Sequence, residues 1–285
     1  MANIRLIRRR IRATQNIAKI TKAMEMIATS KMRRAQEAGL AGRPYAEKIH
    51  QVIADLAALP QEARPIHALL QRRPVNKIAI VHITPDRGLC GGLHATINRL
   101  TASFILQQSV PVTLIITGSK GLDFMRRYGR DIRAEFTRLG DRPSLADTLP
   151  ISRILIDDYS NGVVDAVYIA YVRFISTTLQ RPILQQILPV EPAVIPRAQN
   201  VDYIYEPDPG HVLGELLPRF VEMQVYHAIL EAIASEQSAR VVAMRNATDN
   251  ANELIQDLTL MYNKARQESI TKELLDITGG AAALA

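Results

Sequence analysis

The chain has 285 residues, a formal net charge of +7 and a 47% apolar composition, which suffices for one large or two small domains with buried cores. Its single cysteine, Cys90, excludes an internal disulfide framework and fits a reducing compartment. We expect no secretory signal, because no apolar run follows the basic start, and no transmembrane helix, because glutamines and a proline interrupt the longest uncharged stretch, 100–119.

Residues 1–59 are predicted to form a long amphipathic helix. Range 1–38 contains neither glycine nor proline, and helical spacing resumes after Gly39, Gly42 and Pro44, so we expect a kinked continuation to about Leu59. A shift of heptad phase is expected after Thr14. The predicted apolar seam consists of Ile4, Ile7, Ile11, Ile17, Ile20, Met24 and Ile27.

Residues 75–208 show strand and helix patterns in alternation. Such alternation implies βαβ crossovers and a largely parallel sheet, so we predict a Rossmann-like α/β domain. The predicted strands are 77–84, 112–117, 131–137, 166–174 and 201–205, and the predicted helices are 91–108, 120–128 and 145–160.

Residues 210–285 are predicted to form a second long helix, since no proline follows Phe220 and no glycine lies between Glu215 and Thr278. A helix over 211–277 would be roughly 100 Å long, so most of it is expected to project from any domain. Apolar residues recur for about seven heptads, with three polar positions interpreted as register devices. The predicted seam is Leu213, Leu216, Phe220, Met223, His227, Leu230, Ala234, Gln237, Val241, Met244, Thr248, Ala251, Ile255, Leu258, Tyr262 and Ala265.

The two ends of the chain carry opposite charge. The first 34 residues have a net charge of +9, and the residues from His211 onward have a net charge of −4. Antiparallel pairing would bring these charges together and cover both seams. The predicted fold is therefore an antiparallel α-helical coiled coil formed by domains 1–59 and 210–285, with the α/β domain, 75–208, inserted between them.

The glycine-rich segment 86–92, DRGLCGG, lies between a predicted strand and a predicted helix. A helix start can bind phosphate, but the segment lacks the glycine spacing and the lysine of nucleotide-binding motifs. We therefore favour a structural turn or a partner-contact loop. Cys90 could act as a nucleophile only beside a histidine such as His82 or His94, and a small residue packed under the loop is favoured. The sequence predicts no catalytic site, cofactor or metal site.

Several colinear motifs resemble the gamma subunit of F-type ATP synthases. They are the N-terminal motif at 20–32 (ITKAMEMIATSKM), the loop 86–92, the segment 205–209 (YEPDP) and two C-terminal motifs at 244–252 and 262–273. The resemblance implies a rotating central stalk. Its helices would enter a ring of three alpha and three beta subunits, while the α/β domain would contact epsilon and the membrane ring of c subunits. Coupling of ion flow to ATP synthesis or hydrolysis at the beta sites would then be mechanical.

The resemblance also implies roles for individual residues. Contacts with beta are implied for Lys19, Lys22, Met24, Arg240, Gln267 and Thr271. An apolar tip turning in a sleeve of the ring is implied for Leu274, Leu275, Ile277, Ala281, Ala282, Ala283 and Leu284, and contacts with the c ring or epsilon for Tyr203, Tyr205 and Glu206. Because Cys90 is the single cysteine, thiol switching of rotation is not expected.

Two other function classes remain as alternatives. A nucleic-acid-binding coiled coil would use the basic N-terminus and would bind in a salt-dependent way, although the sparse aromatic residues and an acidic partner helix disfavour it. A nucleotide-binding α/β enzyme would bind ATP as an isolated chain. Under the stalk interpretation we expect no nucleic-acid partner, and a peripheral position at the cytoplasmic face of a bacterial cell membrane, held there through partner subunits.

Overall fold

The computed structural model describes residues 4–57, 67–191 and 205–284. The chain divides into two compact units, one formed by Met1–Ala28 with Val241–Ala285 and the other by Thr29–Arg240. They are called the terminal unit and the sheet unit below. The predicted division into domains 1–59, 75–208 and 210–285 follows the helices and strands, and it stays a prediction.

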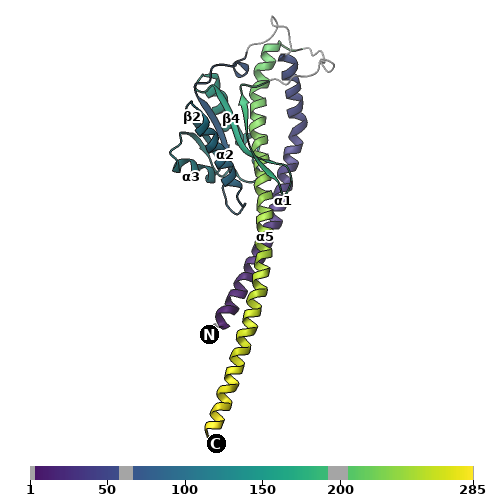
Figure 1. The fold of residues 1–285 in the computed structure, drawn as a ribbon. Helices are drawn as coiled ribbons and strands as arrows, with labels where there is room; N and C mark the ends of the chain where they lie inside the picture. The colour runs from purple at the N-terminus through teal and green to yellow at the C-terminus, as the bar shows by residue number, and fades with distance from the viewer. Residues whose placement is uncertain (1–3, 58–66, 192–204, 285) are drawn as a thin grey trace. The chain divides into compact units, whose positions relative to one another are not determined.

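Two long helices, α1 (Ile4–Ala57) and α5 (Pro209–Leu284), contribute to both units (Figure 1). Helix α1 continues through Gly39, Gly42 and Pro44. At Gly42 the helix passes close to α5, because a Cβ atom at this position would lie 2.8 Å from Cε1 of His227. The prediction of a long helix at each end of the chain is confirmed.

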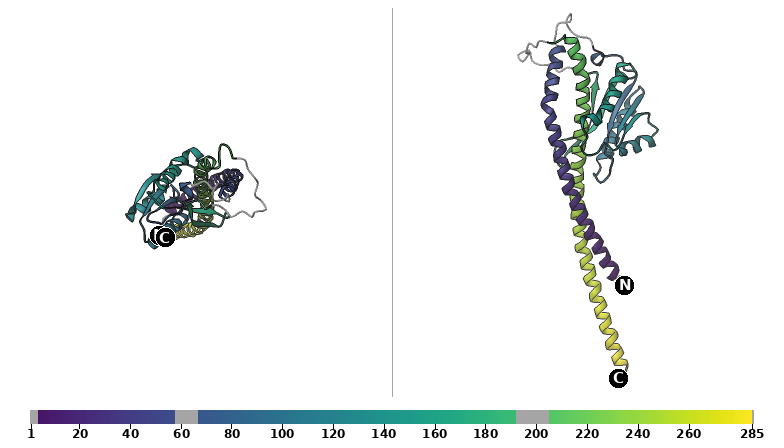
Figure 2. Two further views of the ribbon diagram at one scale, coloured as in Figure 1. Left: turned by 90° about the horizontal axis from the view of Figure 1, so that it is seen from above. Right: turned by 180° about the vertical axis from the view of Figure 1, so that it is seen from behind.

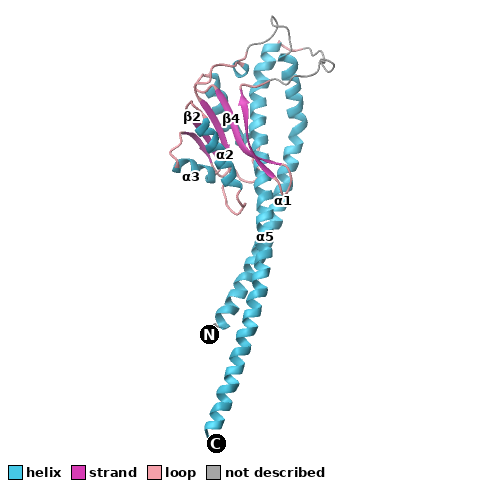
Figure 3. Cartoon of the chain, in the orientation of Figure 1, coloured by secondary structure: helices cyan, strands magenta, loops and turns pink. Residues whose placement is uncertain are grey.

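The sheet unit contains a five-stranded sheet, shown in magenta in Figure 3. Its strands are β1 (Ile78–Ile83), β2 (Val112–Thr117), β3 (Ile132–Phe136), β4 (Ala166–Phe174) and β5 (Gln180–Leu188), in the order β3-β2-β1-β4-β5. The first four strands are parallel, and β5 pairs antiparallel with β4. This arrangement confirms the largely parallel, Rossmann-like sheet.

Helices cover both faces of the sheet (Figure 2). Because side chains alternate along a strand, Ile78 and Ile80 point to the face covered by α2 (Leu93–Gln107) and α3 (Ser119–Arg127). Ala79 and Val81 point to the other face, in a core shared with α4 (Leu145–Ser160), the 3₁₀ helix η1 (Ala68–Leu70) and parts of α1 and α5.

The loop after β1 and the start of α3 lie together at the carboxyl ends of the strands. Gly118, between β2 and α3, has a φ of +91°, and a Cβ atom there would lie 1.9 Å from the Thr84 carbonyl oxygen. The Thr84 hydroxyl accepts a hydrogen bond from the Gly121 amide at 2.8 Å. The loop after β1 and the start of α3 are therefore in direct contact.

Most predicted elements of the sheet unit are confirmed with ends within two residues, but β5 was missed. Its sequence, QRPILQQIL, contains Pro182 and three glutamines and lacks clear alternation. A proline is tolerated here because β5 lies at the sheet edge. The strand predicted over 201–205 lies outside the described residues except for Tyr205.

The seam of α1 in the terminal unit differs from the predicted one. Four buried residues of α1 follow one another at a constant spacing of seven: Ile7, Thr14, Thr21 and Ala28. The heptad phase therefore does not shift after Thr14. Ile17, Ile20 and Ile27, predicted to be in the seam, are 53%, 58% and 55% exposed. The prediction followed the largest apolar side chains, whereas the helices meet through threonine and alanine.

The seam of α5 is confirmed. In the terminal unit Val241, Met244, Ala251 and Leu258 are buried, and in the sheet unit the predicted positions from Leu213 to Gln237 are buried or half-buried. Leu258 is the last buried residue among the described side chains of α5. The predicted positions Tyr262 and Ala265 are half-buried.

Candidate functional site

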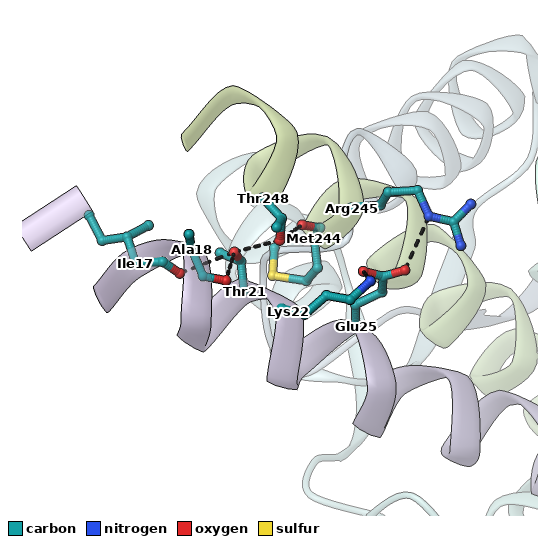
Figure 4. A network of polar contacts seen from close by, with 8 residues as sticks. All are labelled: Ile17, Ala18, Thr21, Lys22, Glu25, Met244, Arg245 and Thr248. Atoms are coloured by element: carbon teal, nitrogen blue, oxygen red, sulfur yellow. Dashed lines mark hydrogen bonds and ion pairs between the residues drawn. The ribbon is translucent and has the colours of Figure 1, made fainter. Parts of the chain in front are cut away.

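A polar network joins α1 and α5 within the terminal unit (Figure 4). The hydroxyls of Thr21 and Thr248 form a hydrogen bond at 2.7 Å. Each hydroxyl is also 2.9–3.1 Å from a carbonyl of its own helix, Ile17 for Thr21 and Met244 for Thr248. The predicted register role of Thr248 agrees with this cross-helix bond.

Glu25 is the second part of this network. Its carboxylate is 3.0 Å from Lys22 Nζ and accepts a hydrogen bond from Arg245 Nε at 3.1 Å. The hydrogen bond from Lys22, with a further contribution from Arg245, holds the pKa of the Glu25 carboxyl below its usual value although burial opposes this. Together with the threonine pair, these contacts fix α1 antiparallel to α5.

Sequence reasoning missed Thr21, Glu25 and Arg245. A signal was present, because Glu25 is the sole acidic residue among the first 34 and a solitary acid in a basic helix suggests a cationic partner. The pairing could not be assigned from sequence, since Arg245 is 220 residues away along the chain.

An open groove with a volume of about 860 Å³ lies between α1 and α5 in the terminal unit. Lys19 and Lys22, both predicted to contact beta, line it opposite Asp249 and Asn252. Met24 is half-buried and does not line this groove. This groove thus brings together two of the six predicted beta-contact residues, Lys19 and Lys22.

Three predicted residues share one face of the C-terminal part of α5. Gln267, Thr271 and Leu275 follow at spacings of four and line a shallow depression of 450 Å³ with Lys264 and Lys272. Leu274 and Ile277, predicted for the apolar tip, are exposed in this chain. The side chains of Ala281, Ala282, Ala283 and Leu284 lie outside the described residues.

Arg240 belongs to the sheet unit, where its guanidinium is mostly buried. Its Nη2 donates hydrogen bonds to Glu236 Oε1 at 2.7 Å and to the Gly88 carbonyl at 3.2 Å. Burial raises the pKa of the Glu236 carboxyl, and the charge of Arg240 opposes this increase. The contact of Arg240 with beta therefore stays a prediction, and in this structure its guanidinium holds the glycine-rich loop.

The residues predicted to contact the c ring or epsilon are placed only in part. Tyr205 is half-buried and packs against the core of the sheet unit, and Glu206 is exposed. Tyr203 lies outside the described residues.

The glycine-rich loop is a structural turn. Asp86 accepts hydrogen bonds from the Ser119 amide, the Ser119 hydroxyl and the Arg138 amide, at 2.9–3.0 Å. Cys90 is fully buried, and burial raises the pKa of its thiol. Its full burial confirms the expectation of a small residue packed under the loop. A buried thiol with a raised pKa is also a poor nucleophile.

His82, one of the two histidines near Cys90 in the sequence, directs its ring nitrogens to helix α2. His82 is fully buried, with Nε2 2.8 Å from Asn98 Oδ1 and Nδ1 3.0 Å from the Thr101 hydroxyl. Burial lowers the pKa of His82 to about 4, although the bond to Asn98 opposes this. Both ring nitrogens are thus engaged with α2.

The crevice in which Rossmann-like sheets bind ligands is filled by α5. With the strand order β3-β2-β1-β4, the crevice lies beyond the carboxyl ends of β1 and β4. Only 50 Å³ of space remains there, bounded by Thr84, Gly118 and Val172 from the sheet side and by Ile233 and Glu236 from α5. A nucleotide has no room at this position.

These features together define a class of protein. The helix pair carries an inserted Rossmann-like domain whose ligand crevice holds its own helix, and it exposes large apolar side chains. This combination is typical of a subunit of a larger assembly. Among the described residues, no three His, Cys, Asp or Glu side chains gather as a metal-ligand set.

Comparisons with known proteins give the family. The family model described as ATP synthase matches residues 3–284. The chain is 67% identical to the ATP synthase gamma chain of Dehalococcoides mccartyi strain CBDB1 over 285 residues, covering 100% of both chains. It is 51% identical to that of Roseiflexus sp. strain RS-1 over 289 residues, covering 100% of this chain and 99% of the relative.

Solved structures show the same fold. A chain of the Euglena gracilis mitochondrial ATP synthase, solved with OSCP, F1 and the c ring, matches with a TM-score of 0.66 and 21% identity, covering 99% of this chain and 94% of that chain. A chain of the Tetrahymena thermophila central stalk and c ring matches with a TM-score of 0.60 and 24% identity, covering 80% and 99%.

This chain belongs to the ATP synthase gamma-chain family. A gamma chain is the non-catalytic central-stalk subunit of the rotary enzyme, and catalysis takes place in the beta subunits. Within the described part of the chain, no helix has both the length and the apolar character that a bilayer crossing requires.

Proposed function

We propose that the chain is the rotating central stalk that couples ion flow through a membrane ring of c subunits to ATP synthesis and hydrolysis at the beta-subunit sites. Ion flow turns the ring and the stalk together. Because the stalk is asymmetric, its rotation moves the three beta sites in sequence through different nucleotide affinities. The chain thereby also regulates the activity of those sites.

The observation that carries this proposal is the exposed apolar surface of the terminal unit. Large apolar side chains on a solvent-facing helix surface usually mark contact with other subunits. Both helices contribute, although each has already buried its seam against the other. The exposed residues are Ile17, Ile20, Met26 and Ile27 on α1, and Leu254, Leu260, Met261 and Ile270 on α5.

The proposed partners are the alpha3 beta3 ring, epsilon and the c ring. The terminal unit would lie inside the alpha3 beta3 ring. Contacts with beta are proposed for Lys19, Lys22, Met24, Arg240, Gln267 and Thr271, and the apolar sleeve is proposed to surround Leu274, Leu275, Ile277 and Leu284. The α/β domain, 75–208, is proposed to carry the contacts with epsilon and c, through Tyr203, Tyr205 and Glu206.

The proposed location is the cytoplasmic face of a bacterial cell membrane. The chain would be peripheral there and would reach the membrane through the c ring. Its similarity to bacterial gamma chains supports this location.

Reconstitution with the alpha and beta subunits of the same organism tests the proposal. We expect a complex with ATPase activity that requires the chain. Ile20→Glu places a charge on the exposed apolar face of α1 and is expected to lower the yield of active complex about tenfold. Leu106→Glu, at a 72% exposed position of α2 in the sheet unit, is the matched control. Failure of the wild-type chain to assemble, or equal effects of the two variants, would contradict the proposal.

A further inference from the structure

Buried hydroxyls on α5 attach this helix to one side of the sheet. Ser235 Oγ donates a hydrogen bond to the Val172 carbonyl at 2.8 Å, at the carboxyl end of β4. Ser238 Oγ donates to the Thr177 carbonyl at 2.9 Å, in the connection between β4 and β5. Both serines are fully buried, so water cannot replace these bonds.

A second set of contacts reaches α5 from loops at the carboxyl ends of other strands. Gln237 Nε2 donates to Asp141 Oδ1 at 3.4 Å, and Arg240 Nη2 donates to the Gly88 carbonyl at 3.2 Å. Asp141 also forms an ion pair of 2.6 Å with Lys31 of α1. The loops after β1 and β3 are therefore bonded to the helix pair.

The two sets lie on opposite sides of α5. Each residue of an α-helix turns the direction of its side chain by about 100°, so Ser235 and Ser238 lie about 60° apart, as do Gln237 and Arg240. The mean directions of the two pairs differ by roughly half a turn. The sheet unit thus holds six consecutive residues of α5, 235–240, from two opposite sides.

Most of the remaining contact between α5 and the sheet in this unit is apolar, apart from a half-exposed ion pair of 3.7 Å between Glu231 and Arg173 of β4. Leu213, Leu217, Val221 and Val225 pack into the core with side chains of the sheet. Apolar burial stabilises such a contact but is not directional, and packed helices can slide by small shear movements. Hydrogen bonds depend on distance and angle, so they oppose turning and sliding.

We propose that Lys31, Asp141, Ser235, Gln237, Ser238 and Arg240 form a polar clamp that transmits torque between the sheet domain and the two long helices. The clamp rests on the proposed stalk function. Its position suits this role, because α1 and α5 continue from Lys31 and Arg240 into the terminal unit. Torque that enters at the sheet domain would pass to both helices through these bonds.

Single-molecule rotation of the reconstituted complex of this chain with alpha and beta subunits tests the clamp. The alpha3 beta3 ring is fixed to a surface, and a bead is attached to the sheet domain through an engineered cysteine at Asp157, with Cys90 replaced by serine. The variance of the bead angle during a pause is inversely related to the torsional stiffness between ring and bead. The test variant is Ser235→Ala with Ser238→Ala and Asp141→Ala, and Arg240 stays unchanged because it is a proposed beta contact.

The control variant is Ser152→Ala with Asp123→Ala. Ser152 is a buried serine of α4 whose hydroxyl has no hydrogen-bond partner among the described residues, and Asp123 is an exposed acid on α3. We expect the clamp variant to increase the angular variance about twofold or more, since it loses all the clamp's directional contacts except the bond from Arg240 to Gly88. The control variant should leave the variance unchanged, and the unloaded ATPase rate should be similar in all variants.

The outcomes separate the clamp from the stalk function. If the wild-type complex rotates and the clamp variant has the same angular variance, the clamp is wrong while the stalk function stands. If the wild-type chain assembles no rotating complex, the stalk function itself fails. Should the triple variant not assemble, Ser235→Ala with Ser238→Ala alone removes one side of the clamp, and unchanged variance in that double variant overturns the proposal.

Discussion

At the scale of single residues, His82 shows how a polar side chain is accommodated inside the sheet unit. Its two ring nitrogens are engaged by Asn98 and Thr101 of α2, so the neutral imidazole is satisfied without water. Protonation would place an uncompensated charge in the core, which is why burial lowers the pKa of His82 to about 4.

This pKa predicts a dependence of stability on pH. Below pH 6.5 the unfolded chain binds a proton at His82 while the folded chain does not, so stability falls with pH until the folded pKa of about 4 is reached. The full loss is about 3 kcal/mol. Urea unfolding followed by far-UV circular dichroism, between about pH 7.5 and about pH 4.5, measures this loss of stability.

His82→Gln is the matched variant, because glutamine keeps hydrogen-bonding capacity and does not titrate. We expect the variant to be less stable at neutral pH but to lose the part of the acid dependence that His82 contributes. Acidic residues such as Glu25 lose their stabilising contribution at lower pH, and they cancel in the comparison. An equal slope in the two proteins would contradict a buried, neutral His82.

At the scale of elements, the seam of the terminal unit depends on hydroxyls and small side chains. Thr14, Thr21 and Ala28 let α1 approach α5, while the larger Ile17, Ile20 and Ile27 remain exposed for other subunits. Sequence reasoning assumed that the largest apolar side chains face the partner helix. That assumption failed because this helix has two partners, its own α5 and, as proposed, the ring.

A double-mutant cycle tests the threonine pair. Thr21→Val or Thr248→Val alone leaves one hydroxyl without its cross-helix partner and is expected to cost about 1 kcal/mol. The double variant should cost less than the sum of the two single changes, because it removes both hydroxyls. Urea unfolding of the four proteins measures the interaction free energy.

Thr259→Val serves as the control for this cycle. Its hydroxyl bonds only to the Ile255 carbonyl of its own helix among the described contacts, and it is exposed. We expect a change within about 0.5 kcal/mol. Strict additivity of Thr21→Val and Thr248→Val would show that the cross-helix bond contributes no stability.

The elements of the sheet unit were largely predictable, for local reasons. Strands β1 and β4 are short apolar runs, and α4 carries a complete helical stripe with Ser144 and Asp147 as its capping box. Strand β5 was missed because its ordering depends on pairing with β4, which its glutamines and Pro182 do not reveal. The bond between Arg240 and Gly88 was equally hidden, since 152 residues separate them.

At the scale of the whole molecule, the chain is a mechanical part whose function depends on faces presented to other subunits. Lys19 and Lys22 line one groove, while Gln267, Thr271 and Leu275 share one face of α5. Their assignment to beta came from resemblance, and it could not come from spacing because the partner surface is another chain.

Met24→Lys tests this assignment in the assembled enzyme. An added cation close to Lys22 changes the charge of a surface proposed to face beta, and Met24 is half-buried. We expect the ratio of ion pumping to ATP hydrolysis to fall about twofold or more, with hydrolysis less affected. Ion pumping into vesicles and the ATPase rate, measured on the same preparation, give this ratio.

Met24→Leu is the control for side-chain volume. It should retain both activities. If Met24→Lys reduced pumping and hydrolysis by the same factor, the change would indicate misfolding, and the proposed contact of Met24 with beta would lose its support.

The crevice filled by α5 has a consequence for how the chain responds to its surroundings. Helix α5 is tethered to the sheet, so it acts as an intramolecular ligand with an effective concentration of about millimolar or higher. A free nucleotide would have to displace Ile233 and Glu236 before it could bind beside Gly118. This crevice is therefore insulated from the concentrations of the nucleotides that the enzyme interconverts.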